Sequence, residues 1–184
     1  MMDFEAQCDA GYLGVASLNV VNPEDYSLVV GHFNKGREES KETVKKISLM
    51  LRVGRCENKS QPLIIAIAAG NIKAESLSKT YDTRTHEPTP ATAKISTGAC
   101  LYVLAGAHRI RATQLASEHL YSDIEGYEAI IKEAEEIDED YNPNSNAEDN
   151  QSTATIQRAA IESSKGLIKV IEKWPVYFYD LGGS

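Results

Sequence analysis

The sequence lacks a long hydrophobic run, a basic leader and any paired cysteine motif. No segment of its 184 residues approaches the roughly 18 consecutive apolar residues of a membrane-spanning helix. The first nine residues, Met-Met-Asp-Phe-Glu-Ala-Gln-Cys-Asp, have neither the basic start nor the apolar stretch of a signal peptide. The three cysteines, Cys8, Cys56 and Cys100, are odd in number and lack the spacing of a zinc site or a disulfide framework. These absences predict an intracellular protein, cytoplasmic or nuclear, with reduced thiols and no membrane contact.

Positive charge is also scarce, with 19 Lys and Arg against 27 Asp and Glu, which gives a net charge of −8. Phosphate contacts along a nucleic acid need a basic surface, so this balance argues against a nucleic-acid partner without excluding one. Residues 123–140 contain nine acids and only Lys132 as a base, and thus hold the whole net charge. This acidic helical segment is either a solvated face or a surface for a basic protein partner. The rest of the chain is neutral, which leaves room for a local basic pocket.

Length and apolar content, 42% of the residues, suit one domain over residues 1–184. Apolar runs bounded by turn residues predict strands, and apolar residues at helical spacing predict helices. Strands are expected at 12–21, 26–33, 62–69, 100–105 and 174–179. Helices are expected at 38–53, in a segment whose first turn holds His108, at 123–140 and at 156–171.

Two stretches interrupt this order. Residues 73–97 are rich in Ser, Thr and Pro and predict a long loop, and residues 141–153 have the composition of a flexible loop. The latter loop lies inside a helical, partly acidic insertion at 121–173, placed before the last strand. The whole pattern predicts a small α+β domain with a mixed sheet, packed helices and this insertion.

The segment Gly106-Ala107-His108-Arg109 joins an apolar strand to a helix. Gly106 permits a sharp reversal, and the unpaired N–H groups of the following helical turn favour an anion. The side chains of His108 and Arg109 would add donors and positive charge, and Thr113, one turn further, would add a hydroxyl. The alternative is an ordinary strand–turn–helix corner, but cations in a first turn oppose the helix dipole, and this favours a phosphate ligand.

The order of these elements resembles the ParB/sulfiredoxin-like superfamily over about two thirds of the chain. The matching pieces are the loop ending near Gly36-Arg37, the helix with Val44, Ile47 and Leu51, the strand 62–67, the Gly106-Ala107-His108-Arg109-Ile110-Arg111-Ala112 segment and the closing strand 175–179. The resemblance implies nucleotide chemistry at the turn. Sulfiredoxins use ATP, ParB proteins bind and hydrolyse CTP, and related serine kinases use ADP or ATP.

The chain departs from each of these branches at its catalytic residue. Ala107 stands where sulfiredoxins have cysteine and ParB proteins have glutamate, and Ala105 stands where the serine kinases have aspartate. The protein is therefore not expected to be a sulfiredoxin. A carboxylate near the turn would help to hold Mg²⁺ and align the phosphate, and Glu38 or Glu39 would have to supply it, or these acids simply start the next helix.

The resulting hypothesis is a nucleotide-binding domain for ATP or CTP with Mg²⁺. Any turnover would be phosphoryl transfer or nucleotide hydrolysis. The expected phosphate contacts are Gly106, Ala107, His108 and Arg109, with Arg37, Lys46 and Thr113 as further candidates. Two alternatives remain, a non-catalytic protein-interaction module on the same fold and a DNA-binding or nuclease-like ParB relative. No set of metal-ligating histidines is indicated by the spacing of the remaining His32, His86 and His119.

Overall fold

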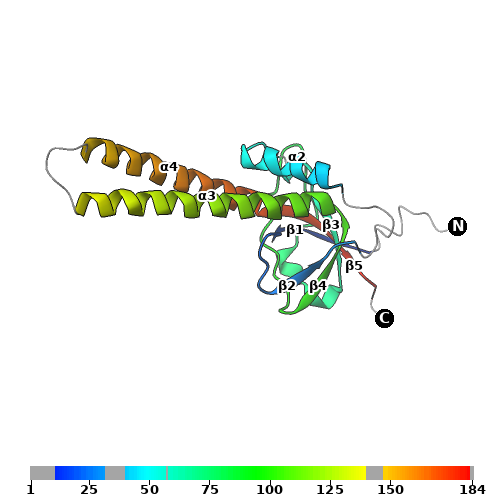
Figure 1. The fold of residues 1–184 in the computed structure, drawn as a ribbon. Coiled ribbons are helices and arrows are strands. Elements are labelled where there is room, and N and C mark those ends of the chain that lie inside the picture. Colours follow the sequence, from blue (N-terminus) through cyan, green and yellow to red (C-terminus); the bar gives the residue numbers. More distant parts are fainter. Residues whose placement is uncertain (1–10, 32–39, 57, 140–146, 183–184) are drawn as a thin grey trace.

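The computed structural model describes residues 11–31, 40–56, 58–139 and 147–182. It is an α+β domain, as predicted, in which a five-stranded sheet is accompanied by long helices (Figure 1). The elements are β1 (Tyr12–Asn19), β2 (Tyr26–Val29), α2 (Lys41–Arg52), η1 (Asn58–Ser60), β3 (Leu63–Ile67), η2 (Ala69–Asn71), η3 (Ala74–Ser76), β4 (Ala99–Ala105), α3 (Ala107–Glu139), α4 (Ala147–Ile171) and β5 (Lys173–Asp180).

The sheet is mixed and has the strand order β1-β5-β3-β4-β2. β5 pairs antiparallel with β1 and parallel with β3, so the last strand of the chain lies inside the sheet. β4 pairs antiparallel with β3 and parallel with β2. The nearly continuous apolar sequence of β3 fits its position between two neighbours, where both faces are largely covered.

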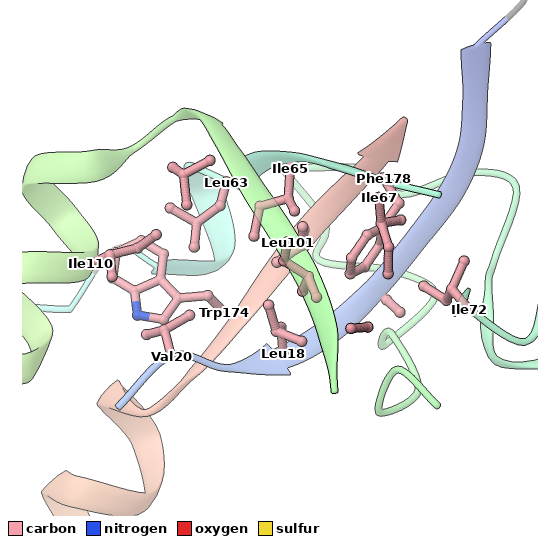
Figure 2. Packing of buried hydrophobic residues seen from close by; sticks show 14 residues of the cluster. Leu18, Val20, Leu63, Ile65, Ile67, Ile72, Leu101, Ile110, Trp174 and Phe178 are labelled. Atoms are coloured by element: carbon pink, nitrogen blue, oxygen red, sulfur yellow. The ribbon is translucent and has the colours of Figure 1, made fainter. Parts of the chain in front are cut away.

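The main hydrophobic cluster lies against one face of this sheet (Figure 2). Leu63, Ile65 and Phe178 are fully buried in it, and Trp174, the chain's one tryptophan, is 3% exposed. The indole N–H of Trp174 donates to the carbonyl of Ile171 (2.8 Å), which satisfies its polar group. The strand alternation therefore places even-numbered residues of β5 in the core and odd-numbered residues on the other face.

The helices form a second hydrophobic cluster among themselves. Buried side chains of α2, α3 and α4, among them Leu51, Ala116 and Ile168, pack together. α3 and α4 then continue as a long helical hairpin that projects away from the sheet (Figure 1). Among the residues that the structure describes, no helix combines the length and apolar character needed to cross a membrane.

The structure corrects two element boundaries inside the predicted insertion of residues 121–173. The helix expected to begin at residue 123 is not separate, because α3 runs without interruption from Ala107 to Glu139. Residues 147–153, expected in a flexible loop, belong to α4. The remainder of that loop up to residue 146 lies outside the described residues. The insertion is thus an extension of two helices that are rooted in the domain.

Residues 73–97 contain one turn of 3₁₀ helix and otherwise irregular backbone. The segment is tied to the outer edge of β1, where the N–H of Val15 donates to Ser78 (2.8 Å) and the N–H of Ser17 donates to Ala91 (2.7 Å). The N–H of Ala93 in turn donates to the carbonyl of Ser17 (2.8 Å). The loop therefore covers a strand edge that would otherwise expose unpaired backbone groups.

Candidate anion site at two helix N-termini

The turn between β4 and α3 depends on Gly106. Its φ of +100° lies in a region that L side chains rarely adopt. A Cβ at this position would overlap the Leu63 side chain and lie 3.2 Å from the Arg109 guanidinium. The glycine therefore serves both the reversal of the chain and the close packing of the turn against β3.

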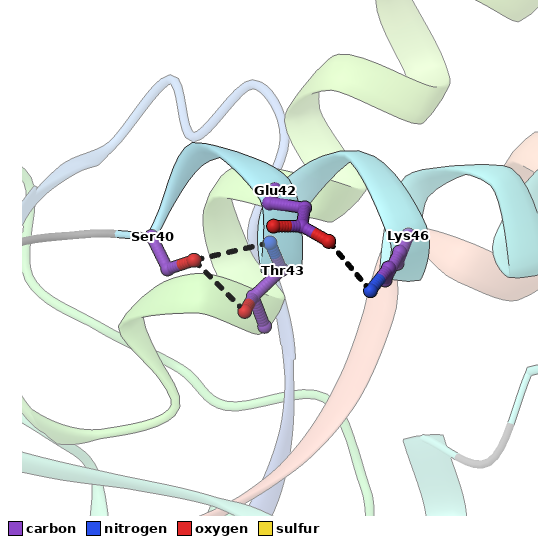
Figure 3. Close-up of polar contacts among 4 residues, drawn as sticks. All are labelled: Ser40, Glu42, Thr43 and Lys46. Carbon is purple, nitrogen blue, oxygen red and sulfur yellow. Dashed lines mark hydrogen bonds and ion pairs between the residues drawn. The ribbon is translucent and has the colours of Figure 1, made fainter.

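The first turn of α3 lies beside the N-terminus of α2. The backbone N–H of Ser40 donates to Nε2 of His108 (3.0 Å) and connects two segments that are 68 residues apart in the sequence. Ser40 is also the N-cap of α2, where its hydroxyl oxygen accepts from the N–H and the hydroxyl of Thr43 (Figure 3). Two helix N-termini, each with a partial positive charge, thus meet at His108.

This contact defines the donor that His108 can offer. Because Nε2 accepts a hydrogen bond, the neutral imidazole carries its proton on Nδ1. The backbone N–H groups of Ala107 and His108 make no hydrogen bond within the part of the chain that the structure describes. Three donors at this helix end, two from the backbone and one from the ring, therefore have no acceptor among the described residues.

The side chain of Arg109 turns back toward the sheet. Its guanidinium donates to the carbonyl of Gln61 and to that of Pro62 (3.4 Å), and it lies 5.7 Å from the ring centroid of Trp174. Desolvation by burial lowers the pKa of Arg109 from its ordinary value. Among the described residues no carboxylate pairs with it. Neutral carbonyls orient this cation but leave its charge uncompensated.

A cavity of about 190 Å³ adjoins Arg109, between α2 and the start of β5. Two arginines, Arg109 and Arg55, provide its positive charge, and Trp174 and Met50 are among its apolar walls. The remaining lining residues are Ile47, Leu51 and Gln61. A cavity with cationic and apolar walls suits an organic anion.

Two of the other predicted contacts, Thr113 and Lys46, are not brought to the turn. Thr113 is fully buried, and its hydroxyl donates to the carbonyl of Arg109 (2.8 Å), so it faces the interior of the helix layer. Lys46 is exposed on α2, where it pairs with Glu42 (2.7 Å) one turn or more after Ser40 (Figure 3). Arg37, Glu38 and Glu39 lie outside the described residues.

Ser40, Gln61 and Trp174 were absent from the residues predicted for the site. Ser40 could have been predicted from the sequence, since serine before an amphipathic run is a typical N-cap. Nothing local in the sequence indicates that Gln61 or Trp174 contacts Arg109.

Within residues 11–31, 40–56, 58–139 and 147–182, no group of three His, Cys, Asp or Glu side chains is placed to hold a metal ion. No family model, curated protein or solved structure matches the chain.

Proposed function

We propose that this domain binds the phosphate groups of a nucleotide, ATP or CTP with Mg²⁺, where the N-termini of α2 and α3 meet. The observation that carries the proposal is the hydrogen bond from Ser40 to His108, because it joins two helix N-termini and leaves Nδ1 as a donor. Helix N-termini are favourable places for phosphate, since their N–H groups and dipoles both attract negative charge. The resemblance of the turn to the ParB/sulfiredoxin-like pattern points to the same chemistry.

The cavity beside Arg109 is the proposed place for the nucleoside. It begins near Ile47, about 10 Å along α2 from Ser40 at 1.5 Å per residue, a span comparable with an extended nucleotide. Arg109 lies between the turn and this cavity, with its guanidinium fixed by the Gln61 and Pro62 carbonyls. The proposed role of Arg109 is therefore to supply fixed positive charge beside the phosphates.

Binding is proposed as the primary activity, and turnover as secondary. Ala107 and Ala105 provide no carboxylate at the turn, and phosphoryl transfer needs groups that hold Mg²⁺ and align the attacking oxygen. Removal of such a group affects the chemical step more than ground-state binding. A phosphotransferase or nucleotide hydrolase of this type would depend on Glu38 or Glu39.

The test is a titration of ATP, ADP and CTP with Mg²⁺ against the full chain, monitored by the fluorescence of Trp174. Since Trp174 is the only tryptophan and contacts Arg109, ligand entry near Arg109 changes its signal. We expect His108→Ala to weaken binding at least tenfold, about 1.4 kcal/mol. His119→Ala is the matched control, because His119 is an exposed histidine of the same helix whose ring nitrogen lies 3.4 Å from the Arg52 guanidinium and not at the turn. Absence of binding for all three nucleotides, or equal affinity in both variants, would contradict the proposal.

A second candidate function, protein interaction through the helical hairpin, is favoured by its projection from the sheet (Figure 1). The exposed side chains include Ile130 on α3 and Ile156 on α4, at 41% and 63% exposure, amid many acids. The experiment replaces residues 132–160 with a short Gly-Ser turn, which keeps the buried Ile124 and Ile168. Loss of a partner in pull-downs with retained nucleotide binding would support this function, and an unchanged set of partners would contradict it.

A further inference from the structure

A second and larger cavity, of about 350 Å³, lies on the other side of β5 from the one beside Arg109. Lys173 and Pro175 line this cavity, whereas Trp174 between them lines the first, as expected from strand alternation. Tyr81 and Pro90 from the loop that covers β1 give it flat apolar walls. The cavity is thus separate from the proposed nucleotide site but shares one strand segment with it.

Positive charge gathers around this cavity in a chain whose net charge is −8. Lys59, Lys169 and Lys173 line it, and none of its lining residues is an acid. None of the three lysines forms an ion pair with a residue that the structure describes. Three ammonium groups without local compensation raise the potential in the cavity and attract an anion.

Side-chain hydrogen bonds to backbone carbonyls hold the segments that carry the lysines in place. The side-chain amide of Asn58, which is 4% exposed, donates to the carbonyls of Val170 (3.1 Å) and Lys173 (2.7 Å). The hydroxyl of Tyr81 donates to the carbonyl of Lys59 (2.8 Å). These contacts join three separate segments of the chain, so the arrangement of the cavity does not depend on one helix end.

His86 provides an independent sign of a polar ligand. It is the non-glycine residue with a positive φ, +62°, among those described, and its N–H donates to the carbonyl of Asp82 (2.7 Å). His86 borders the cavity, and its Nδ1 atom is buried without a hydrogen-bond partner among the residues that the structure describes. A buried polar atom with no partner is costly, and such atoms in folded proteins require an explanation. Strained backbone is also typical of ligand sites.

We propose that this cavity binds a small phosphate monoester that carries a flat ring. A phosphate dianion has three terminal oxygens directed to different sides, which matches ammonium groups from three segments better than a planar carboxylate does. The faces of Tyr81, Pro90 and Pro175 provide the apolar contact for the ring. This is a second site, and it does not rest on nucleotide binding at His108.

Phenyl phosphate is the probe, with benzoate and phenol as comparisons, in calorimetric and NMR titrations of the full chain. We expect phenyl phosphate to bind more tightly than benzoate, and phenol to bind weakest. The backbone resonances of Tyr81, His86 and Lys173 should shift in the complex. In Lys169→Gln/Lys173→Gln the affinity should fall at least tenfold.

The matched control is Lys132→Gln/Lys165→Gln, which removes the same charge from two exposed lysines that pair with Glu136 and Glu162. It should bind phenyl phosphate like the unmodified protein, and so should His108→Ala. Equal losses in both double variants would reduce the effect to net charge and overturn the proposal. So would absent binding, tighter binding of benzoate, or shifts confined to the turn at His108. Failure of nucleotide binding would leave these results unaffected.

Discussion

The two candidate anion sites lie on opposite sides of the start of β5, and they are built in different ways. The site at His108 depends on a contiguous tetrapeptide and on one helix N-cap, Ser40. The cavity at Lys173 combines side chains from β1, η1, the loop of residues 73–97, α4 and β5. A site of the first kind leaves a motif in the sequence, and a site of the second kind leaves only scattered lysines.

The sites also differ in how their cations are held. Arg109 is partly buried, bonded to carbonyls and placed over Trp174, so its orientation is fixed before any ligand arrives. The three lysines of the other cavity have exposed side chains, and the backbone at Lys173 is held by the hydrogen bond from Asn58. The first arrangement favours orientation of a ligand, and the second favours attraction of charge.

The largest expected effect comes from a methyl group at the turn. Gly106→Ala requires a positive φ and overlaps Leu63, and together these should lower the free energy of unfolding by about 2 to 4 kcal/mol. Gly98→Ala is the control, because Gly98 has φ +82° and no described atom beyond its two chain neighbours lies within 4 Å of the place that its new methyl group would take. Only about 1 kcal/mol of conformational cost therefore remains. Urea denaturation measures both, and equal losses would show that the packing against Leu63 is unimportant.

The next largest effect is expected at Asn58, whose hydrogen bonds hold the backbone of the second cavity in place. Asn58→Ala leaves the carbonyls of Val170 and Lys173 without their donor, which should cost about 1 to 3 kcal/mol in unfolding free energy. Phenyl phosphate binding should weaken as well, while nucleotide binding at His108 persists. Asn22→Ala, at an exposed turn position, should stay within about 0.5 kcal/mol of the unmodified protein. An Asn58→Ala protein as stable as the unmodified protein would show that these two hydrogen bonds do not contribute to stability.

The sequence was sufficient to predict the class of the fold and the main elements, because their signals are local. The apolar run of β3 and the stripe of α2 each identify an element without reference to the rest of the chain. The strand–turn–helix at Gly106 is predictable for the same reason. The continuity of α3 is not, since the change from an apolar to an acidic composition near residue 123 resembles a boundary although the helix does not end there.

Local sequence patterns did not predict the direction in which the site side chains point. Thr113 lies at helical spacing from Arg109, but its hydroxyl bonds to the carbonyl of Arg109 and is buried. Arg109 faces carbonyls of residues 61 and 62, and that contact follows from the pairing of β3 with β4. The second cavity was not predicted from the sequence, because it depends on how the loop of residues 73–97 lies against β1.

A smaller effect is expected at Arg109. Arg109→Met removes two hydrogen bonds to carbonyls and the cation beside Trp174, and should lower stability by about 1 to 2 kcal/mol. It should also change the intrinsic fluorescence, since Trp174 is the only tryptophan. Arg109→Lys keeps the charge but not the planar fork, and we expect intermediate stability and weakened nucleotide binding. Nucleotide affinity that is unchanged in Arg109→Met would remove Arg109 from the proposed site.

The smallest effect is a pH dependence in the loop that carries His86. The N–H groups of Arg84 and Thr85 donate to the carboxylate of Asp82 and lower its pKa from the ordinary 3.8. Because the pKa of Asp82 is lower in the folded protein, its carboxylate stabilises the fold at pH values above the pKa of the unfolded chain. This contribution is lost as the pH falls through the pKa of the folded protein.

The stability difference between the unmodified protein and Asp82→Asn should therefore be constant near neutrality and shrink below about pH 4. Urea denaturation of both proteins from pH 7 to pH 3 measures it, and a difference that grows toward low pH would contradict the assignment. Since Asp82 is exposed and its partners are in the same turn, the change should concern the local geometry at His86 more than the global fold, and phenyl phosphate binding is its sharper readout.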